Sequence, residues 1–200
     1  MAKYKVFDNF LSNSDFIELT NNMSPPTSFN EIVKPNQLGW IYAPGQAKGN
    51  WISKVERFEK ITNIKPLDPL HQWVFGHVFF IAGYISPVMY ILNTLLQKIN
   101  PLALSRIQAN FTVQQEKRGR SGFHIDLGDE PFKHTSPITS IFYMNTTNGP
   151  TILEDGTEIE CRANRLVSYP HNTYHAGVLC TDQPYRIVIN LNYFKDLDFS

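Results

Sequence analysis

Cysteine, net charge and long apolar runs are all scarce in this sequence. The two cysteines, Cys161 and Cys180, are too few for a disulfide framework, and no apolar signal-peptide region follows Met1. We therefore expect free thiols in a reduced, cytoplasmic setting. The longest apolar run, residues 73–85, is shorter than a membrane span and is interrupted by glycine and histidine, so we expect no membrane segment.

Charge balance and length narrow the classes of function and the number of domains. The 18 basic and 18 acidic residues cancel, so no net positive field would attract nucleic acid, although a local basic groove is compatible with this balance. With 200 residues and 42% hydrophobic content, the chain can build one sizeable core and is short for two. We therefore expect one domain over residues 1–200, without internal repeats.

The first half of the chain predicts one strand and two helices. Ser12 followed by Asp15 resembles a capping box, and Ser86-Pro87 supplies an N-cap and a first-turn proline. Turn-forming residues interrupt any period over 24–44, and the apolar run 73–81 is too short to separate a strand from a buried helical turn. The expected elements are a strand over 4–10, helices over 12–23 and 86–99, and at most a short strand over 38–42.

After Pro101 the sequence predicts β-structure. Residues 104–115 alternate between apolar and polar positions, and Asp155-Gly156 between two strand-like runs is a strong hairpin signal. Short strands at close spacing after two helices are typical of a double-sheet jelly roll with helical support. We expect a mainly β, α+β fold: an N-terminal strand and helices over 1–103, and a jelly-roll core over 104–200. Further strands are expected over 138–145, 151–154, 157–161, 165–169, 174–179 and 185–194.

A His-x-Asp pair, His124 and Asp126, stands in a segment that reads as extended. Side chains two apart on a strand share a face, with Cα atoms about 6–7 Å apart, so both groups can bind one ion. With His175 as the best second histidine, they form the triad that suits non-haem Fe(II). The alternative for the isolated pair is a strand histidine with ordinary hydrogen bonds. His171, in the turn after Pro170, is the main rival of His175.

Arg186 begins the next predicted strand, residues 185–194. The period of two places Arg186, Asn190 and Asn192 on one face and four apolar or aromatic residues on the other. Because the second face is so apolar, we expect a central strand whose arginine and asparagines line a pocket. The alternative is that Arg186 pairs with a core carboxylate.

This combination resembles the Fe(II)- and 2-oxoglutarate-dependent dioxygenases, and among them the small prolyl 4-hydroxylase-like members, including those encoded by phages. The resemblance covers about 104–194, nearly half the chain, and a phage-encoded member would act in the host cytoplasm. It rests on Phe123-His124-Ile125-Asp126, His175-Ala176-Gly177, the Arg186 strand and the segments 138–145, 154–156 and 163–166.

The resemblance implies a role for each candidate site residue. His124, Asp126 and His175 would hold Fe(II) as the catalytic centre. Arg186 would bind the distal carboxylate of 2-oxoglutarate through a bidentate pair, for which guanidinium geometry is well suited. Tyr143 would hydrogen-bond the same carboxylate; its alternative role is an aromatic side chain packed in the core.

Four further polar residues are candidates, two of them from the resemblance and two from the faces of the predicted strands. Asn190 matches a position near the cosubstrate, and Asn192 matches one nearer the substrate. Asn110 and Thr112 face the same way on the preceding strand and are candidates for contact with either, with solvent exposure as the alternative.

The implied activity is hydroxylation with Fe(II), O2 and 2-oxoglutarate, giving succinate and CO2, with ascorbate as a candidate reductant. A peptidyl proline or another peptide side chain is the expected substrate. Arg186 stands where many collagen-type relatives have lysine, and this residue does not determine the substrate. One alternative is the same chemistry on nucleic acid bases, supported only by Lys117-Arg118-Gly119-Arg120. The other is a non-catalytic metal-binding jelly roll. Residues 114–122 read either as a lid or as a solvated loop.

Overall fold

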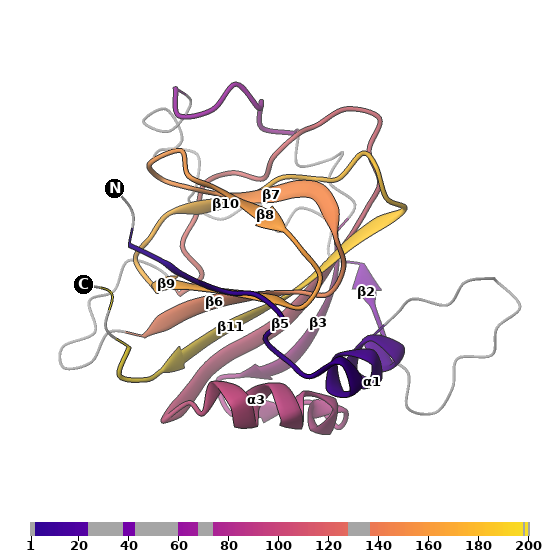
Figure 1. Ribbon diagram of the computed structural model, residues 1–200, viewed down its shortest axis with the longest axis vertical. Helices are drawn as coiled ribbons and strands as arrows, with labels where there is room; N and C mark the ends of the chain where they lie inside the picture. Colours follow the sequence, from indigo (N-terminus) through magenta and orange to yellow (C-terminus); the bar gives the residue numbers. More distant parts are fainter. Residues whose placement is uncertain are drawn as a thin grey trace, which may run out of the picture.

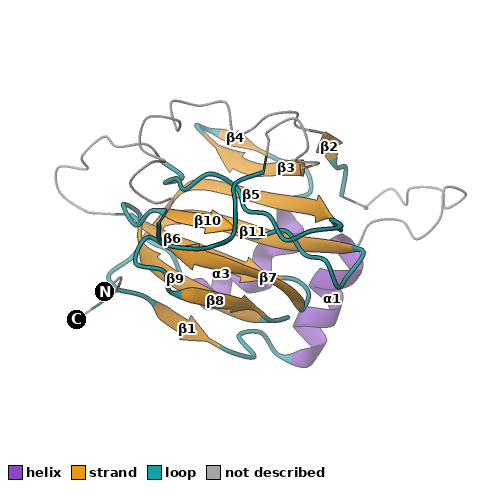
Figure 2. Cartoon of the chain, turned by 90° about the horizontal axis from the view of Figure 1, so that it is seen from above, coloured by secondary structure: helices purple, strands orange, loops and turns teal. Residues whose placement is uncertain are grey.

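The computed structural model describes residues 3–23, 38–42, 60–67, 74–127, 137–197 and 199. Two antiparallel sheets face each other, and the helices lie against the outer side of the larger sheet (Figure 1). Seen from above, α3 lies behind the strands (Figure 2). The expected mainly β fold, a jelly-roll core with N-terminal helices, is confirmed.

The larger sheet has eight strands in the order β1-β9-β6-β11-β5-β3-β2, with β4 paired to β3. The smaller sheet has the order β10-β7-β8. The strands are β1 (Lys5–Phe7), β2 (Ile41–Tyr42), β3 (Val74–Ile81), β4 (Tyr84–Ile85), β5 (Ala103–Val113), β6 (Ile138–Tyr143), β7 (Thr147–Leu153), β8 (Glu158–Cys161), β9 (Arg165–Pro170), β10 (His175–Gly177) and β11 (Tyr185–Phe194).

The first helix, α1 (Asn13–Met23), begins where the sequence predicts. The Ser12 hydroxyl accepts the backbone N–H of Asp15 at 3.2 Å and donates to the Asp15 carboxylate at 2.6 Å. Leu19 and Met23 are buried against the larger sheet. No helix in the described ranges is long and apolar enough to cross a membrane.

The single helix expected over 86–99 is wrong in its first half. A 3₁₀ turn, η3 (Met89–Leu92), precedes the short helix α3 (Asn93–Ile99). The Ser86 hydroxyl is hydrogen-bonded to His77 Nε2 on β3 at 2.9 Å, and the Met89 N–H bonds to the Ser86 carbonyl at 2.9 Å. This tie to β3 favours tight i→i+3 bonds over a capped α-helix.

The apolar run 73–81, which the sequence left open between strand and helical turn, is the strand β3 beside β5. It continues into β4 through Ala82 and Gly83, whose φ angles are +47° and +87°. Positive φ at both central residues gives a tight two-residue hairpin. Most of the expected irregular stretch 24–44 lies outside the described residues.

The alternation expected for β5 and β11 is confirmed and separates the core from the cavity. Their apolar faces pack toward the helices, and each fully buried aliphatic side chain contributes about 1.5–3 kcal/mol. Their polar faces turn toward the smaller sheet and line a cavity. The apolar face comprises Ile107, Ala109, Ile187, Ile189 and Leu191, and the cavity face includes Arg106, Asn110, Thr112, Arg186 and Asn190.

Asn164 ties the N-terminal segment to the turn before β9. It adopts φ +60°, and its buried side chain accepts the Leu11 N–H at 2.8 Å and donates to the Leu11 carbonyl at 2.9 Å. Because Asn164→Ala would leave both backbone groups without these partners, we expect a loss of about 2–4 kcal/mol in the free energy of unfolding. Urea unfolding measures it.

Asn9→Ala is the matched control, because Asn9 also has positive φ, +50°, but is exposed. We expect it to cost about 1 kcal/mol from backbone strain alone. Equal losses for the two variants would show that the Leu11 hydrogen bonds contribute nothing.

Candidate metal centre and cosubstrate pocket

The two histidines of the predicted triad lie directly opposite each other. His124 and His175 exchange a pair of backbone N–H···O=C hydrogen bonds, both 2.9 Å, and their ring centroids are 4.5 Å apart. The extended segment expected around His124 is reduced to this one antiparallel pairing, which joins an otherwise irregular segment to β10. Phe123 anchors it in a buried apolar cluster with Ile152 and Ala176 of the smaller sheet.

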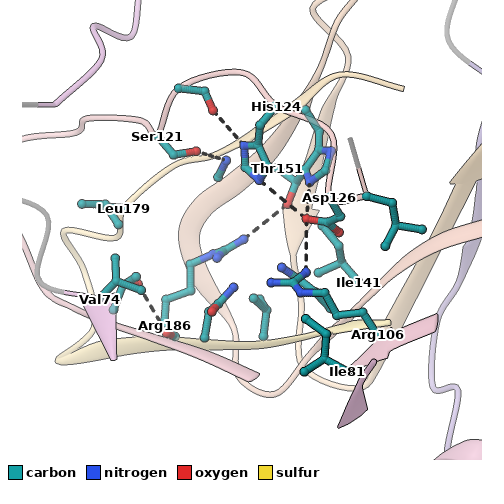
Figure 3. A pocket seen from close by; sticks show the side chains of 18 of the residues that line it. Val74, Ile81, Arg106, Ser121, His124, Asp126, Ile141, Thr151, Leu179 and Arg186 are labelled. Carbon is teal, nitrogen blue, oxygen red and sulfur yellow. Dashed lines mark hydrogen bonds and ion pairs between the residues drawn. The ribbon is translucent and has the colours of Figure 1, made fainter. Parts of the chain in front are cut away.

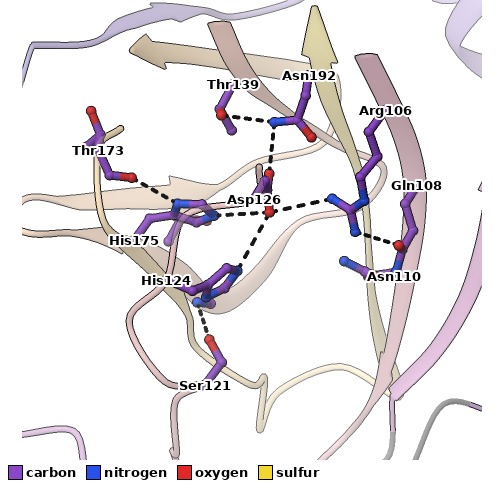
Figure 4. Close-up of polar contacts among 12 residues, drawn as sticks. Arg106, Gln108, Asn110, Ser121, His124, Asp126, Thr139, Thr173, His175 and Asn192 are labelled. Carbon is purple, nitrogen blue, oxygen red and sulfur yellow. Dashed lines mark hydrogen bonds and ion pairs between the residues drawn. The ribbon is translucent and has the colours of Figure 1, made fainter. Parts of the chain in front are cut away.

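The donor atoms of His124, Asp126 and His175 all lie within 4.8 Å of one another. The Asp126 Oδ1 atom is 3.8 Å from His124 Nε2 and 4.0 Å from His175 Nε2 (Figure 4). Each Nδ1 faces a backbone carbonyl, Gly122 O at 2.9 Å and Thr173 O at 3.3 Å. Because a carbonyl only accepts, each Nδ1 carries the proton and each Nε2 lone pair is available. The set fits a divalent metal.

The charge state of these groups also suits metal binding. Burial alone would raise the pKa of the Asp126 carboxyl, but His175, Arg106, His124 and the amide of Asn192 hold that pKa below its ordinary value. Burial and the neighbouring His124 lower the pKa of His175 to about 4. A carboxylate and a neutral imidazole are the forms that bind a metal.

Asn192 is not among the lining residues of the cavity; it holds the carboxylate of the candidate ligand Asp126. Its side-chain amide donates to Asp126 Oδ2 at 3.2 Å and to Thr139 Oγ1 at 3.0 Å. This leaves Oδ1 turned toward the two histidines. The rival histidine, His171, is not part of the cluster of donor atoms found in the described residues.

A cavity of about 620 Å³ extends from the three candidate ligands to Arg186 (Figure 3). Its walls come from β5, β11 and the smaller sheet. Apolar as well as polar side chains line it. The lining includes His124, Asp126, His175, Arg106, Asn110, Thr112, Thr151, Ile141, Leu179, Arg186, Val188 and Asn190.

Arg186 is 5% exposed and has its guanidinium partly fixed by neutral groups. Its Nε donates to the Gly149 carbonyl at 2.8 Å and one terminal nitrogen to Thr151 Oγ1 at 3.3 Å. Within the described ranges it forms no ion pair, so the core carboxylate of the alternative reading is not found there. A Cβ on Gly149 would lie 2.5 Å from the Val178 carbonyl and 3.2 Å from Arg186 Cδ, so this approach requires glycine.

Tyr143 lies behind the cavity wall. Its fully buried hydroxyl donates to Thr151 Oγ1 at 2.8 Å, its ring centroid lies 5.7 Å from the Arg186 guanidinium carbon, and burial raises its pKa to about 12. Thr151 thus links Tyr143 to Arg186. The sequence did not single out Thr151 or Arg106, because a lone threonine or arginine on a strand carries no motif.

The remaining predicted residues line the cavity and differ in whether their side-chain oxygen atoms already take part in hydrogen bonds. Asn190 Oδ1 is buried, and no hydrogen bond to it is found in the described structure. Asn110 Oδ1 accepts the Gln108 amide at 2.7 Å, and Thr112 Oγ1 donates to the Arg186 carbonyl at 3.3 Å. Both Asn110 and Thr112 therefore face the cavity rather than bulk solvent.

The predicted basic cluster over 117–120 does not form a continuous basic surface. Arg120 is buried: its Nε donates to the Ile64 carbonyl at 2.9 Å, and its guanidinium carbon lies 5.0 Å from the Phe123 ring centroid. Only Lys117 and Arg118 of this cluster are exposed. The surrounding segment is hydrogen-bonded to the 177–180 region, and its role as a lid stays a prediction.

No protein-family model matches the sequence. A search of curated proteins finds no match either. Solved structures do match. A collagen prolyl hydroxylase of Paramecium Bursaria Chlorella virus-1, as its 2-oxoglutarate complex, aligns over 97% of this chain and 97% of its own, with 13% identity and a TM-score of 0.53.

Two further structures extend the likeness. A Trichoplax adhaerens prolyl hydroxylase in complex with a hypoxia inducible factor peptide covers 97% of this chain and 84% of its own, with 14% identity and a TM-score of 0.53. The α-ketoglutarate-dependent epimerase SnoN of nogalamycin biosynthesis covers 96% and 77%, with 11% identity and a TM-score of 0.55. The chain has the fold of the 2-oxoglutarate-dependent oxygenases. At such identities the fold is shared, and the chemistry must be argued from the residues.

Asn192→Ala tests how Asp126 is held. Without the amide, the carboxylate loses its fixed orientation, and we expect Mn(II) affinity, measured by electron paramagnetic resonance, to fall about 10–100-fold. Asn190→Ala is the matched control on the same face of β11. Equal losses in both variants would contradict a specific role of Asn192.

Proposed function

We propose that this protein is an Fe(II)- and 2-oxoglutarate-dependent oxygenase that hydroxylates a peptide side chain, with a prolyl side chain as the reference case. The observation that carries the proposal is the pairing, in one cavity, of a two-histidine, one-carboxylate donor set with a buried arginine that has no described carboxylate partner. Either feature alone has ordinary structural explanations. Together they supply the two anchors that a 2-oxo diacid needs.

The chain's own residues divide the work between metal and cosubstrate. His124, Asp126 and His175 would hold Fe(II), which when bound supplies open coordination positions and the capacity to activate O2. Arg186 would bind the distal carboxylate of 2-oxoglutarate. A buried guanidinium without a counter-ion is costly, so a carboxylate ligand there replaces a missing charge partner.

Thr151 orients the Arg186 guanidinium, and the apolar side chains of Ile141, Leu179 and Val188 exclude water around the bound diacid. In the overall reaction, 2-oxoglutarate loses CO2, one oxygen atom of O2 enters succinate and the other enters a C–H bond of the substrate. Ascorbate serves as an auxiliary reductant in this proposal.

The edge of the cavity supports a protein or peptide substrate. Ile81 and Ala82 line it, and the adjoining Tyr84 and Ile85 of the β3–β4 hairpin are 52% and 61% exposed. Clustered exposed apolar side chains beside a polar site are typical of a surface that binds another chain. The peptide complex of the Trichoplax adhaerens relative is consistent with this. In the part of the chain that the structure describes, no observation favours nucleic acid, since Arg120 of the basic cluster is buried.

Arg186→Gln tests the cosubstrate site. Removing one partner of a buried charge pair costs about 2–5 kcal/mol, so we expect 2-oxoglutarate affinity, measured by calorimetry on the Mn(II)-loaded protein, to fall at least about 30-fold. Arg186→Lys keeps the charge but not the bidentate geometry, so its 2-oxoglutarate affinity should lie between those of Arg186→Gln and the unmodified protein. Arg118→Gln removes an exposed positive charge and serves as the control.

Turnover provides the second readout. With Fe(II), O2 and ascorbate, we expect succinate from 2-oxoglutarate, abolished by His124→Ala. A protein that binds zinc as readily as iron, fails to bind 2-oxoglutarate and yields no succinate with any peptide would instead be the non-catalytic metal-binding jelly roll.

A further inference from the structure

A second arginine, Arg106 on β5, lies in the same cavity with an unused donor. One terminal nitrogen donates to Gln108 Oε1 at 2.5 Å, and the other, Nη1, lies 3.6 Å from Asp126 Oδ1 (Figure 4). That distance permits attraction but is too long for a hydrogen bond. Nη1 is buried, and the described residues offer it no hydrogen-bond partner.

Asp126 does not account for this donor. Its Oδ2 atom accepts the Asn192 amide, and its Oδ1 atom faces both histidine Nε2 atoms, where the metal would bind. A metal bound at Oδ1 would neutralise the carboxylate charge of Asp126 that attracts Arg106. The Arg106 guanidinium would then lie beside the metal cation, and its Nη1 would still lack a hydrogen-bond partner among the described residues.

The charges of the cavity indicate what would satisfy Arg106. Among the described residues of its lining, and apart from the two candidate histidines, the charged side chains are Arg106, Arg186 and Asp126. With a divalent metal and neutral imidazoles, these groups carry a net charge of about plus three, and the 2-oxoglutarate dianion removes two. One positive charge remains, next to the metal.

The position of Arg106 separates it from the cosubstrate end. In the β3–β5 pairing it lies opposite Ile81, beside the β3–β4 turn, whereas Arg186 lies opposite Thr112 at the other end of β5. Arg106 therefore faces the side from which the proposed substrate enters. The two carboxylates of 2-oxoglutarate already have partners in Arg186 and the metal.

We propose that Arg106 binds a carboxylate carried by the substrate and so sets its specificity. The inference rests on the proposed function and deepens it: the group presented to the metal, or its immediate neighbour, is acidic rather than a wholly neutral prolyl segment. The carboxylate belongs either to an acidic side chain within a peptide or to a free small acid. Gln108 fixes the guanidinium plane, which leaves Nη1 directed at the incoming group.

The test uses the protein loaded with Mn(II) and the inert N-oxalyl analogue of 2-oxoglutarate. The probes are N-acetyl-aspartate against N-acetyl-asparagine, and a capped pentapeptide containing aspartate against the same peptide with asparagine. Affinity is measured by calorimetry, and proximity to the metal by Mn(II)-induced relaxation of probe protons. A charged hydrogen bond is worth about 1.5–3 kcal/mol, so we expect at least one acid probe to bind about 10-fold or more tighter than its amide.

Variants assign that preference to Arg106. Arg106→Gln should abolish it, and Arg106→Lys should keep part of it. Arg162→Gln, which removes an exposed guanidinium that pairs with the exposed Glu160, should keep it fully. Thermal unfolding of each variant checks that the fold is retained.

Each outcome bears on the inference. A preference confined to the peptide pair identifies an acidic side chain in a protein as the source, and one confined to the acetylated amino acids identifies a small acid. Equal binding of acid and amide, including no binding of either, overturns the inference. So does an acid preference that survives in Arg106→Gln, or a large fall of 2-oxoglutarate affinity in that variant, which would assign Arg106 to the cosubstrate. Failure of the unmodified protein to bind 2-oxoglutarate would instead overturn the proposed function itself.

Discussion

The rest of the site depends on one pair of backbone hydrogen bonds between His124 and His175. These residues are far apart in the sequence, yet the pairing brings both imidazoles to one side of the smaller sheet. Asp126 then follows His124 at a fixed spacing and meets both rings. Because backbone bonds set these positions, the geometry of the candidate donor set is built into the fold.

Around this pairing, the candidate ligands and Arg186 are each oriented by a hydrogen bond to a neutral group. The histidines use Nδ1 on carbonyls, Asp126 uses Oδ2 on an amide, and Arg186 uses Nε on the Gly149 carbonyl. Each of these side chains is thereby held in place, and His124, Asp126, His175 and Arg186 line the cavity. The same arrangement holds for Arg106, with Gln108 as the orienting neighbour.

Sequence patterns predicted the fold and the candidate donor set, but not the contacts that orient the side chains of the site. The alternation in β5 and β11 predicted which side chains face the cavity, because strand periodicity is local. The distortion of the helix at Ser86 depends on His77, and the burial of Arg120 depends on Ile64; both contacts join distant residues and leave no local pattern. Asn192 illustrates the same limit. The strand face on which it lies was predictable, whereas its hydrogen bond to Asp126 joins residues far apart in the sequence and is seen only in the structure.

The central strand β11 fixes the span of the whole site. Arg186 and Asn192 belong to it, and their partners on β5 are Thr112 and Arg106, so the anchors at the two ends are separated by a fixed count of peptide units. A slip of one residue would turn both ends into the apolar core, and hydrogen bonds on both edges of the strand oppose it. The strand therefore acts as a spacer of fixed length between Arg186 and Asn192, the residue that holds Asp126. In the proposed function, this spacing limits the length of the diacid that the cavity can accept.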